Sequence, residues 1–471
     1  MREAQVQEKM AGKKIFVLGI GKTGMSVANH LSQLGVHLTV FDDKKQSVTP
    51  EMQKLIDKAG VQFILGEPTT EELDSSFDLM IKNPGIPYTH PLVKKAMDLN
   101  ISVVTDVEVS GWLSEAMIIG ITGSNGKTST TSLIAKILSE SALTGKTYLG
   151  GNIGIPTLDI SLQAKKADRL VLELSSFQLQ GTSDFHPHIA SLLNLYPTHL
   201  DYHGSMENYL EAKWHITKNQ MAEDYLLLNA DQPLLWEKRH DTEATVVPIS
   251  MTMPELDPVG AWYDEQRETL NWGNETVAKR SSLVLPGNHN VQNALNALAV
   301  AKLLQVENET IQHVFEHFRG VKHRIQWVGD IRGRSFYNDS KATNNEAALT
   351  ALNSFTRPVV WIAGGLDRHI PLDELKPALK HVKAVVVIGE TAAKFKKLAQ
   401  SVGIETIEEA EWIEDAVDKA YQLSAPEDVI LLSPASASWD QYPSFEVRGD
   451  RFIQEVEQLM SKESKTAKGA L

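Results

Sequence analysis

The chain has 471 residues, of which 42% are hydrophobic and 23% charged, a composition typical of a soluble globular protein of about three domains. It contains no cysteine, which excludes disulfides, zinc–thiolate sites and cysteine nucleophiles. The formal net charge of −14 argues against a general nucleic-acid binder, and no apolar run approaches the roughly 20 residues of a membrane span. Since no signal-like segment precedes Ile15 and no extended pairing surface is evident, we expect a monomeric cytoplasmic enzyme.

Strands and helical segments alternate along the chain and predict an α/β protein with three domains, at 1–105, 106–320 and 321–471. The strands are near-continuous apolar runs, which is typical of mostly parallel sheets with helices on both faces. We therefore expect a Rossmann-like N-terminal domain, a P-loop-type central ATPase domain and a Rossmann-like C-terminal domain. Residues 231–282 mix short β-like pieces with polar turns and allow no assignment.

In the first domain, a glycine-rich motif follows the first of five predicted strands, which cover 14–18, 38–41, 61–65, 79–81 and 101–104. Gly19-Ile-Gly-Lys-Thr-Gly24 matches the dinucleotide-binding pattern, and Asp42 and Asp43 end the second strand about 20 residues further on. A uridine diphosphate fits this short domain better than NAD, and glycines that only allow tight strand–helix packing are the third alternative. Asn83-Pro-Gly-Ile86 ends the fourth strand, beside the same crevice.

The central domain opens on a phosphate-binding pattern. Ile121-Thr-Gly-Ser-Asn-Gly-Lys-Thr-Ser129 follows the apolar strand 117–120 and precedes a helical pattern over 130–138. The backbone N–H groups of such a loop close around phosphate oxygens, Lys127 reaches the outer phosphates and Thr128 holds Mg²⁺. Because the strict pattern has glycine where Ile121 stands, the loop is a variant, and a plain glycine-rich turn is the alternative.

Two further strands, 169–173 and 189–194, are followed by polar residues. Glu173, at the end of the first of them, is placed either to hold Mg²⁺ near the phosphate loop or to join a buried ion pair. His199 follows the second strand and is either a metal ligand or a solvated loop histidine. Lys213 lies in a helical segment and, taken by itself, indicates a surface lysine.

Three asparagines are also candidates for ligand contacts. Asn152, in Gly150-Gly-Asn-Ile-Gly154, is either a turn residue or a substrate contact. Asn290 and Asn293 are three residues apart at the start of a predicted helix, so they share one face of it. Such a pair either hydrogen-bonds a purine or caps the helix.

The third domain contributes predicted strands at 358–362, 384–388 and 428–432, with polar motifs around them. At this point the sequence resembles the Mur ligase family, which builds the peptide stem of bacterial cell-wall precursors, and the resemblance covers nearly the whole chain in order. Besides the phosphate loop it rests on Glu173-Leu-Ser-Ser-Phe-Gln178, Asn338-Asp-Ser-Lys-Ala-Thr-Asn344, Leu432-Ser-Pro-Ala-Ser-Ala-Ser-Trp-Asp-Gln-Tyr442 and Phe445-Glu-Val-Arg-Gly449. The Asp-Asn-Pro-Arg motif of the member that adds diaminopimelate or lysine is absent.

The resemblance implies an ATP-dependent, ADP-forming ligase that adds D-glutamate to UDP-N-acetylmuramoyl-L-alanine through an acyl phosphate, in cytoplasmic peptidoglycan synthesis. The residues it implies for the UDP substrate are Lys22, Thr23, Asp42, Asp43, Asn83, Gly85, Asn152 and Gln178. Those for ATP are Gly123, Ser124, Asn125, Gly126, Lys127, Thr128, Ser129, Asn290, Asn293, Arg324 and Asp339. Those for two Mg²⁺ ions are Thr128, Glu173, His199 and a carbamylated Lys213. Those for D-glutamate are Lys341, Thr343, Ser438, Phe445 and Arg368, the last standing where some members have lysine.

The catalytic set would then consist of Lys127, Glu173, His199 and Lys213. Three other functions compete with this interpretation. An NAD-dependent oxidoreductase follows from Gly19–Gly24 alone, but it leaves the lysine loop and the third domain without a role. A nucleotide-driven switch or scaffold would hydrolyse ATP without any dependence on an amino acid. Folylpolyglutamate synthase resembles the Mur ligases and also adds glutamate, but it lacks a UDP-binding first domain.

Overall fold

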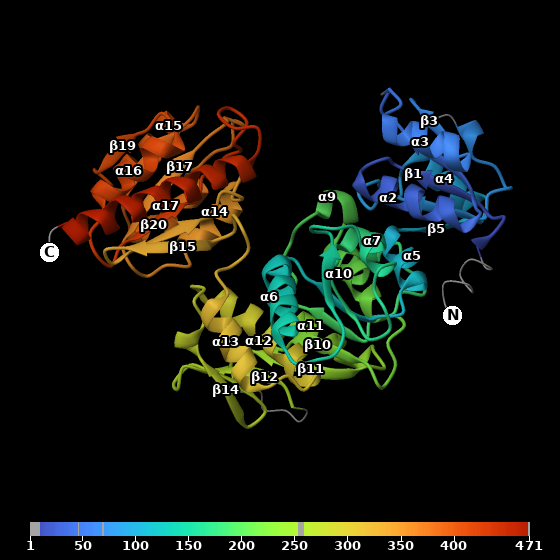
Figure 1. Ribbon diagram of the computed structural model, residues 1–471, viewed down its shortest axis with the longest axis horizontal. Coiled ribbons are helices and arrows are strands. Elements are labelled where there is room, and N and C mark those ends of the chain that lie inside the picture. The colour runs from blue at the N-terminus through green and yellow to red at the C-terminus, as the bar shows by residue number, and fades with distance from the viewer. Residues whose placement is uncertain (1–9, 46, 68–69, 253–258, 470–471) are drawn as a thin grey trace. The chain divides into compact units, whose positions relative to one another are not determined.

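The computed structural model of the protein describes residues 10–45, 47–67, 70–252 and 259–469. Their strands form three sheets, which are divided between two units of the chain (Figure 1). Met1–Arg280 and Val291–Val314 make up the first unit, which holds two of the sheets, and Ser281–Asn290 and Phe315–Leu471 make up the second. The predicted α/β class with three mostly parallel sheets is confirmed.

The first sheet has the strand order β3-β2-β1-β4-β5, and all of its strands are parallel. The strands are β1 (Lys14–Leu18), β2 (His37–Asp42), β3 (Gln62–Leu65), β4 (Leu79–Lys82) and β5 (Ser102–Val104). The connecting helices are α2 (Lys22–Leu31), α3 (Pro50–Ala59) and α4 (Pro91–Asp98). Helix α3 shows how local sequence sets these bounds, because Thr49 Oγ1 accepts from the N–H of Met52 at 3.3 Å and Gly60 ends the helix at φ 64°.

The central sheet has nine strands in the order β14-β13-β12-β11-β10-β9-β6-β8-β7, and only β12–β14 pair antiparallel. The strands are β6 (Met117–Thr122), β7 (Thr147–Gly151), β8 (Arg169–Glu173), β9 (Ile189–Leu192), β10 (Tyr225–Asn229), β11 (Thr245–Ser250), β12 (Ala261–Asp264), β13 (Thr269–Trp272) and β14 (Glu275–Lys279). The segment 231–282, which the sequence left unassigned, therefore extends this sheet, although 253–258 lie outside the described residues.

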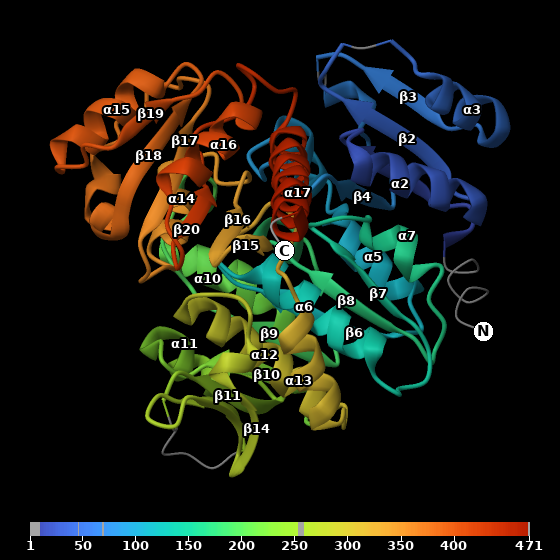
Figure 2. The same ribbon diagram turned by 60° about the vertical axis from the view of Figure 1, so that its left-hand side comes forward.

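Short helices surround the central sheet, and α6 packs against β6, β7 and β8 directly after the phosphate loop (Figure 2). The first of them are α5 (Asp106–Leu113), α6 (Lys127–Glu140), α7 (Thr157–Ser161), α8 (Ser176–Leu179) and α9 (Leu200–His203). The later ones are α10 (Met206–Trp214), α11 (Pro233–Glu237), α12 (Asn288–Leu303) and α13 (Asn308–His317). Within the described ranges, no helix combines the length and the hydropathy that a membrane crossing requires.

The third sheet has the order β15-β16-β20-β17-β18-β19, with only the β15–β16 pair antiparallel. Its strands are β15 (Gln326–Ile331), β16 (Arg334–Asn338), β17 (Val359–Gly364), β18 (Val382–Ile388), β19 (Ile407–Glu409) and β20 (Val429–Leu432). Its helices are α14 (Asn345–Leu352), α15 (Ala392–Ser401), α16 (Ile413–Leu423) and α17 (Phe445–Gly469).

Strand β17 explains why the predicted strands are apolar without alternation. Trp361 belongs to the buried cluster on one face of the sheet, whereas Val360 and Ile362 belong to the cluster on the other face. Because successive side chains of a strand point to opposite faces, a sheet covered on both sides needs apolar residues at every position.

Candidate functional site

The strand order of the first sheet reverses at β1. The chain adds β2 and β3 on one side of β1 and then β4 and β5 on the other side. Ligands of open α/β sheets bind at the carboxyl ends of the strands beside such a switch point. Gly19–Gly24 follow β1 there, and Asn83 follows β4. A Cβ on Gly24 would lie 1.9 Å from the Gly19 carbonyl oxygen, so the third glycine of the motif is required by packing.

The two carboxylates predicted to approach a ribose both have partners, Asp42 in the glycine-rich loop and Asp43 at the start of α4. Asp42 Oδ2 accepts from the N–H of Ile20 at 2.8 Å, so Asp42 fixes the glycine-rich loop itself. Asp43 is half-exposed and lies 3.2 Å from His90 Nε2. Lys22 and Thr23 begin α2 beside the same loop, with Lys22 exposed.

The loop predicted to bind phosphate turns at a left-handed glycine directly before α6. Gly126 precedes α6 at φ 83°, and Lys127 Nζ donates to the carbonyl oxygens of Gly123 and Ser124 at 2.8 Å each. Asn194, which the sequence analysis did not single out, accepts from the N–H of Asn125 at 2.9 Å. Since Asn194 stands just after β9, its place at the carboxyl end of a strand was the signal available for it.

Glu173 lies beside this loop with both carboxylate oxygens in use. Oε2 accepts from Thr128 Oγ1 at 2.7 Å, and Oε1 accepts from Asn152 Nδ2 at 3.0 Å. The side chain is buried, and it interacts electrostatically with the buried amine of Lys213, which is described below. A carboxylate next to a threonine hydroxyl supplies the oxygen ligands that Mg²⁺ prefers, so these residues fit the ion.

Lys213 is not the surface lysine that its helical context indicates, because its side chain is only 1% exposed. Its Nζ donates to the Gly123 carbonyl oxygen at 2.8 Å, the same oxygen that accepts from Lys127, and lies 4.5 Å from the Tyr209 ring centre. Burial, together with the charge of Lys127, holds the pKa of Lys213 well below its usual range. The structure therefore brings Lys127, Glu173 and Lys213 together at one loop.

His199 stands next to this cluster, at the N-cap of α9. It is exposed and has a left-handed backbone at φ 56°, which is uncommon for a non-glycine residue. Its ring lies 5.1 Å from that of Phe177 and 6.4 Å from that of Tyr209, measured between centroids. Among the residues described, no three His, Asp or Glu side chains form a ready metal site, so a metal here needs ligands of other types.

The remaining asparagine and glutamine candidates, Asn293, Gln178 and Asn290, also have structural roles. Asn293 Oδ1 accepts from Thr130 Oγ1 at 3.1 Å and leaves no room for a Cβ on Gly126, which would approach it to 2.5 Å. Gln178 is buried and closes a capping box with Ser175 at the start of α8. Asn290, assigned to the second unit, donates from Nδ2 to the Pro286 carbonyl oxygen at 2.7 Å.

In the second unit, the residues predicted for the amino acid follow adjacent strands β16, β20 and β17. Lys341 Nζ lies 5.6 Å from the Phe445 ring, and Arg368 lies 4.9 Å from the Trp439 ring. Ser438 is buried, and no hydrogen bond to its hydroxyl is formed by the described residues. Thr343 is half-buried, and its N–H donates to the Lys341 carbonyl oxygen at 2.9 Å.

Arg448 holds these loops together, although sequence reasoning gave it no role. It is buried, and its guanidinium donates to the carbonyl oxygens of Ser340 and Ser436 at 2.9 and 3.0 Å. Burial lowers its pKa to about 10. The signal in the sequence was a single arginine within the motif at 445–449, which does not reveal burial.

Arg324 and Asp339 lie close together in the second unit. Asp339 accepts from the N–H of Ile325 at 3.1 Å and from Ser433 Oγ at 2.8 Å. His323 and Ile325, on either side of Arg324, have φ of 66° and 41°. A β-branched residue in this region is strained, and such strain clusters at functional sites.

Asp339 gives a prediction for stability. Burial raises its pKa from 3.8 to about 7, so between these values the folded protein binds a proton that the unfolded chain has lost. The stabilisation from this proton is fully present below the lower value and is lost as pH rises through the higher one. Asp339→Asn cannot ionise, so from pH 5 to pH 8 its free energy of unfolding should rise relative to the parent by about 1–3 kcal/mol. Urea unfolding at both pH values measures this, and a difference that does not change with pH contradicts it.

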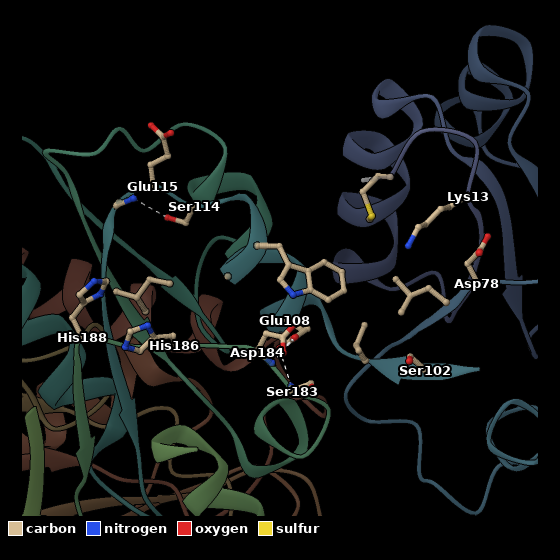
Figure 3. A pocket seen from close by; sticks show the side chains of 17 residues that line it. Lys13, Asp78, Ser102, Glu108, Ser114, Glu115, Ser183, Asp184, His186 and His188 are labelled. Atoms are coloured by element: carbon tan, nitrogen blue, oxygen red, sulfur yellow. Dashed lines mark hydrogen bonds between the residues drawn. The ribbon is translucent and has the colours of Figure 1, made fainter. Parts of the chain in front are cut away.

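A cavity of about 1010 Å³ in the first unit lies at the opposite ends of the strands from the glycine-rich loop and the phosphate loop. Figure 3 shows the side chains that line it. Lys13, Asp78 and His188 line it, and each directly precedes a strand. Glu108, also in its lining, accepts from the backbone N–H groups of Ser183 and Asp184 at 2.9 and 2.7 Å. Because the phosphate loop and Asn83 follow the carboxyl ends of strands, the cavity is separate from the candidate site.

Comparison with known proteins identifies the family of the chain. Three family models match: Mur ligase MurD-like, N-terminal domain (residues 13–105), Mur ligase middle domain (121–301) and Mur ligase, glutamate ligase domain (323–436). The UDP-N-acetylmuramoylalanine--D-glutamate ligase of Streptococcus sanguinis is 47% identical over 95% of this chain and 98% of its own. The ligase of the same name from Halalkalibacterium halodurans is 48% identical over 96% and 99%.

A solved structure supports the fold. MurF ligase from Thermotoga maritima in complex with ADP aligns over 97% of each chain with a TM-score of 0.54, at 18% identity. Three α/β domains with a phosphate loop and a carboxylate at the end of the neighbouring strand define a nucleotide-dependent enzyme. With relatives at 47% identity over nearly its whole length, the chain belongs to the Mur ligase family and is an ATP-dependent, ADP-forming ligase.

Proposed function

We propose that this protein uses ATP to join D-glutamate to UDP-N-acetylmuramoyl-L-alanine, as a monomer in cytoplasmic peptidoglycan precursor synthesis. The observation that carries the proposal is that Lys127 and Lys213 both donate to the Gly123 carbonyl oxygen, while Glu173 accepts from Thr128 of the same loop. The substrates are those in the names of the curated relatives described above.

The three substrates are assigned to the domains proposed at 1–105, 106–320 and 321–471. In the first, the residues that bind the UDP moiety stand at the ends of β1, β2 and β4, and they are Lys22, Thr23, Asp42, Asp43, Asn83 and Gly85, with Asn152 and Gln178 from the second. In the second, Gly123–Ser129 bind the phosphates of ATP. Asn290 and Asn293 of the second domain, with Arg324 and Asp339 of the third, contact its base, ribose and phosphates. In the third, D-glutamate is bound by Lys341, Thr343, Arg368, Ser438 and Phe445.

Thr128 and Glu173 would hold one Mg²⁺, and His199 and a carbamylated Lys213 would hold a second. The low pKa of Lys213 favours its neutral amine, the form whose nitrogen bonds to CO₂ with loss of a proton. The resulting carboxylate supplies an oxygen ligand from a position that an aspartate would not reach. Bound Mg²⁺ neutralises charge on the transferring phosphoryl group.

Two chemical steps follow from this arrangement. A carboxylate oxygen of the acceptor's alanine attacks the γ-phosphorus of ATP while Lys127 balances the charge of the outer phosphate oxygens, and ADP leaves. The amine of D-glutamate then attacks the acyl carbon and loses a proton, and phosphate leaves with the former carboxylate oxygen. Formation of the acyl phosphate turns a poor leaving group into a good one, so water must be excluded from it.

Phosphate release from ATP tests this proposal directly. With UDP-N-acetylmuramoyl-L-alanine present, a panel of D- and L-amino acids should give release that depends on D-glutamate. Phosphate release without an amino acid would favour a nucleotide-driven switch. Binding of NADH in preference to UDP would favour an oxidoreductase. Turnover with a different amino acid or a folate acceptor would favour another ligase.

A further inference from the structure

Lys82 is a buried cation that the proposed function does not use. It ends β4 directly before Asn83 and is only 1% exposed. Its Nζ donates to the carbonyl oxygens of Ile86 at 2.9 Å and Pro84 at 3.3 Å and lies 4.7 Å from the Tyr88 ring. The hydrogen bonds described for this ammonium group thus go to loop carbonyls rather than to a carboxylate, and burial lowers its pKa to about 8. A charged group is costly to bury, so its position needs a reason.

The Ile86 carbonyl oxygen is shared with a residue of the central sheet's helices. Tyr202 Oη donates to it at 3.3 Å, and Tyr202 belongs to α9, which begins just after His199. The Tyr202 ring lies 4.6 Å from that of Phe177, which itself lies 5.1 Å from the His199 ring. The loop after β4 is therefore linked through Tyr202 and Phe177 to the histidine proposed as a metal ligand.

The same loop also contacts the glycine-rich motif. A Cβ on Gly19 would lie 2.9 Å from Asn83 Cβ, and one on Gly21 would lie 3.1 Å from Asn83 Nδ2. The C=O of Pro84 and the N–H of Gly85 belong to one trans peptide, in which the two groups point in opposite directions. Because the Pro84 oxygen accepts from Lys82, the Gly85 N–H points away from the lysine. That N–H points toward Asn83, whose Oδ1 accepts it at 3.3 Å.

We propose that Lys82 and Tyr202 are positioning residues, which set the Asn83–Ile86 loop for the anionic UDP substrate and hold it in register with α9. The inference rests on the proposed function, since it assigns this loop to the acceptor substrate. Lys82 shapes the loop and adds positive charge beneath it, which favours a diphosphate. Tyr202 fixes the distance from that loop to the metal-binding side of the central domain, on which reactive alignment depends.

Steady-state kinetics of the full chain tests the inference with Lys82→Met, Tyr202→Phe and the double variant. Lys82→Met should raise the KM for UDP-N-acetylmuramoyl-L-alanine about tenfold, because it removes a charged donor, and leave the KM for ATP unchanged. Tyr202→Phe should mainly lower kcat, by several-fold. Since both side chains donate to one oxygen, the double variant should lose less in kcat/KM than the product of the two single losses.

Two further variants act as controls. Lys94→Met removes an exposed lysine of α4 and should behave as the parent. Tyr88→Phe keeps the ring beside Lys82 but removes the hydrogen bond from Tyr88 Oη to the Gln180 carbonyl oxygen at 3.2 Å. It therefore tests whether losing a different hydrogen bond between the first two domains lowers kcat as much as Tyr202→Phe does. Losses equal to those of Tyr202→Phe, or independent effects in the double variant, overturn the inference.

Calorimetric binding of UDP-N-acetylmuramoyl-L-alanine without ATP separates this inference from the proposed function. Weaker binding by Lys82→Met than by the parent, with parental circular dichroism, supports the positioning role. Equal binding by both proteins overturns it even if the parent is an active ligase. A parent that binds the nucleotide but never turns over contradicts the proposed function and leaves the binding comparison valid. If Lys82→Met does not fold, Tyr202→Phe carries the kinetic test.

Discussion

Lys213→Ala should lose D-glutamate-dependent phosphate release by more than about 100-fold, since even outer partners of metal ligands contribute 10–100-fold. The wild-type side chain is buried against the phosphate loop, whereas the two glutamates of helix α10, Glu207 and Glu211, are exposed. If the carbamate is the ligand, a small carboxylic acid can enter the space that alanine leaves. Formate or acetate in the millimolar range should therefore restore part of the activity of Lys213→Ala.

The matched control for this prediction is Lys218→Ala, which removes an exposed lysine five residues further along the chain. It should retain parental activity and should not respond to formate. Activity of Lys213→Ala close to that of the parent removes the carbamate from the mechanism. If Lys213→Ala is folded but inactive, and formate and acetate do not restore its activity, Lys213 has a role in packing alone.

Lys127→Ala should lose ligation by about a thousandfold or more, because the ammonium group balances charge that develops on the transferred phosphoryl group. Binding of the UDP substrate should be almost unchanged, since most of the residues assigned to that substrate belong to a different sheet and Lys127 is not among them. Lys136→Ala is the control on the same helix, where its Nζ pairs with Glu140 at 2.6 Å and its side chain is 48% exposed.

Isothermal calorimetry with UDP-N-acetylmuramoyl-L-alanine and the phosphate-release assay measure the two halves of this prediction separately. Turnover by Lys127→Ala near the parental rate shows that the loop has been assigned wrongly. A loss of UDP-substrate binding as large as the loss of turnover indicates a general folding defect, which Lys136→Ala should not share.

Much of the fold could be predicted because many of its strands, such as β8 and β17, are nearly continuous apolar runs. The strand predicted at 169–173 has the observed bounds of β8, and the first predicted strand, 14–18, has those of β1. Strands β12–β14 were not predicted, because they are short and pair antiparallel at the edge of the sheet, where β14 has exposed residues among its buried ones. Without a regular period, such strands resemble polar loops.

Lys213 shows what a local pattern cannot contain. Its neighbours predict a helix, and α10 is there, but its burial depends on the Gly123 carbonyl oxygen 90 residues earlier in the sequence. The phosphate loop is different, since its glycines and lysine are adjacent in the chain and their geometry is set by the loop itself. Asn194 and Tyr202 are intermediate cases. Each lies at or near the end of a segment that the sequence predicts, but the sequence does not reveal which residues they hydrogen-bond.

An isotope experiment tests the central claim most directly, because the first step transfers a phosphoryl group to a carboxylate oxygen. UDP-N-acetylmuramoyl-L-alanine carrying ¹⁸O in its alanine carboxylate is converted with ATP and D-glutamate, and the released phosphate is examined by mass spectrometry. One labelled oxygen should appear in the phosphate, because it leaves with phosphorus when the amine attacks. Phosphate without label, or label in AMP, would show that no acyl phosphate is formed and would contradict the account.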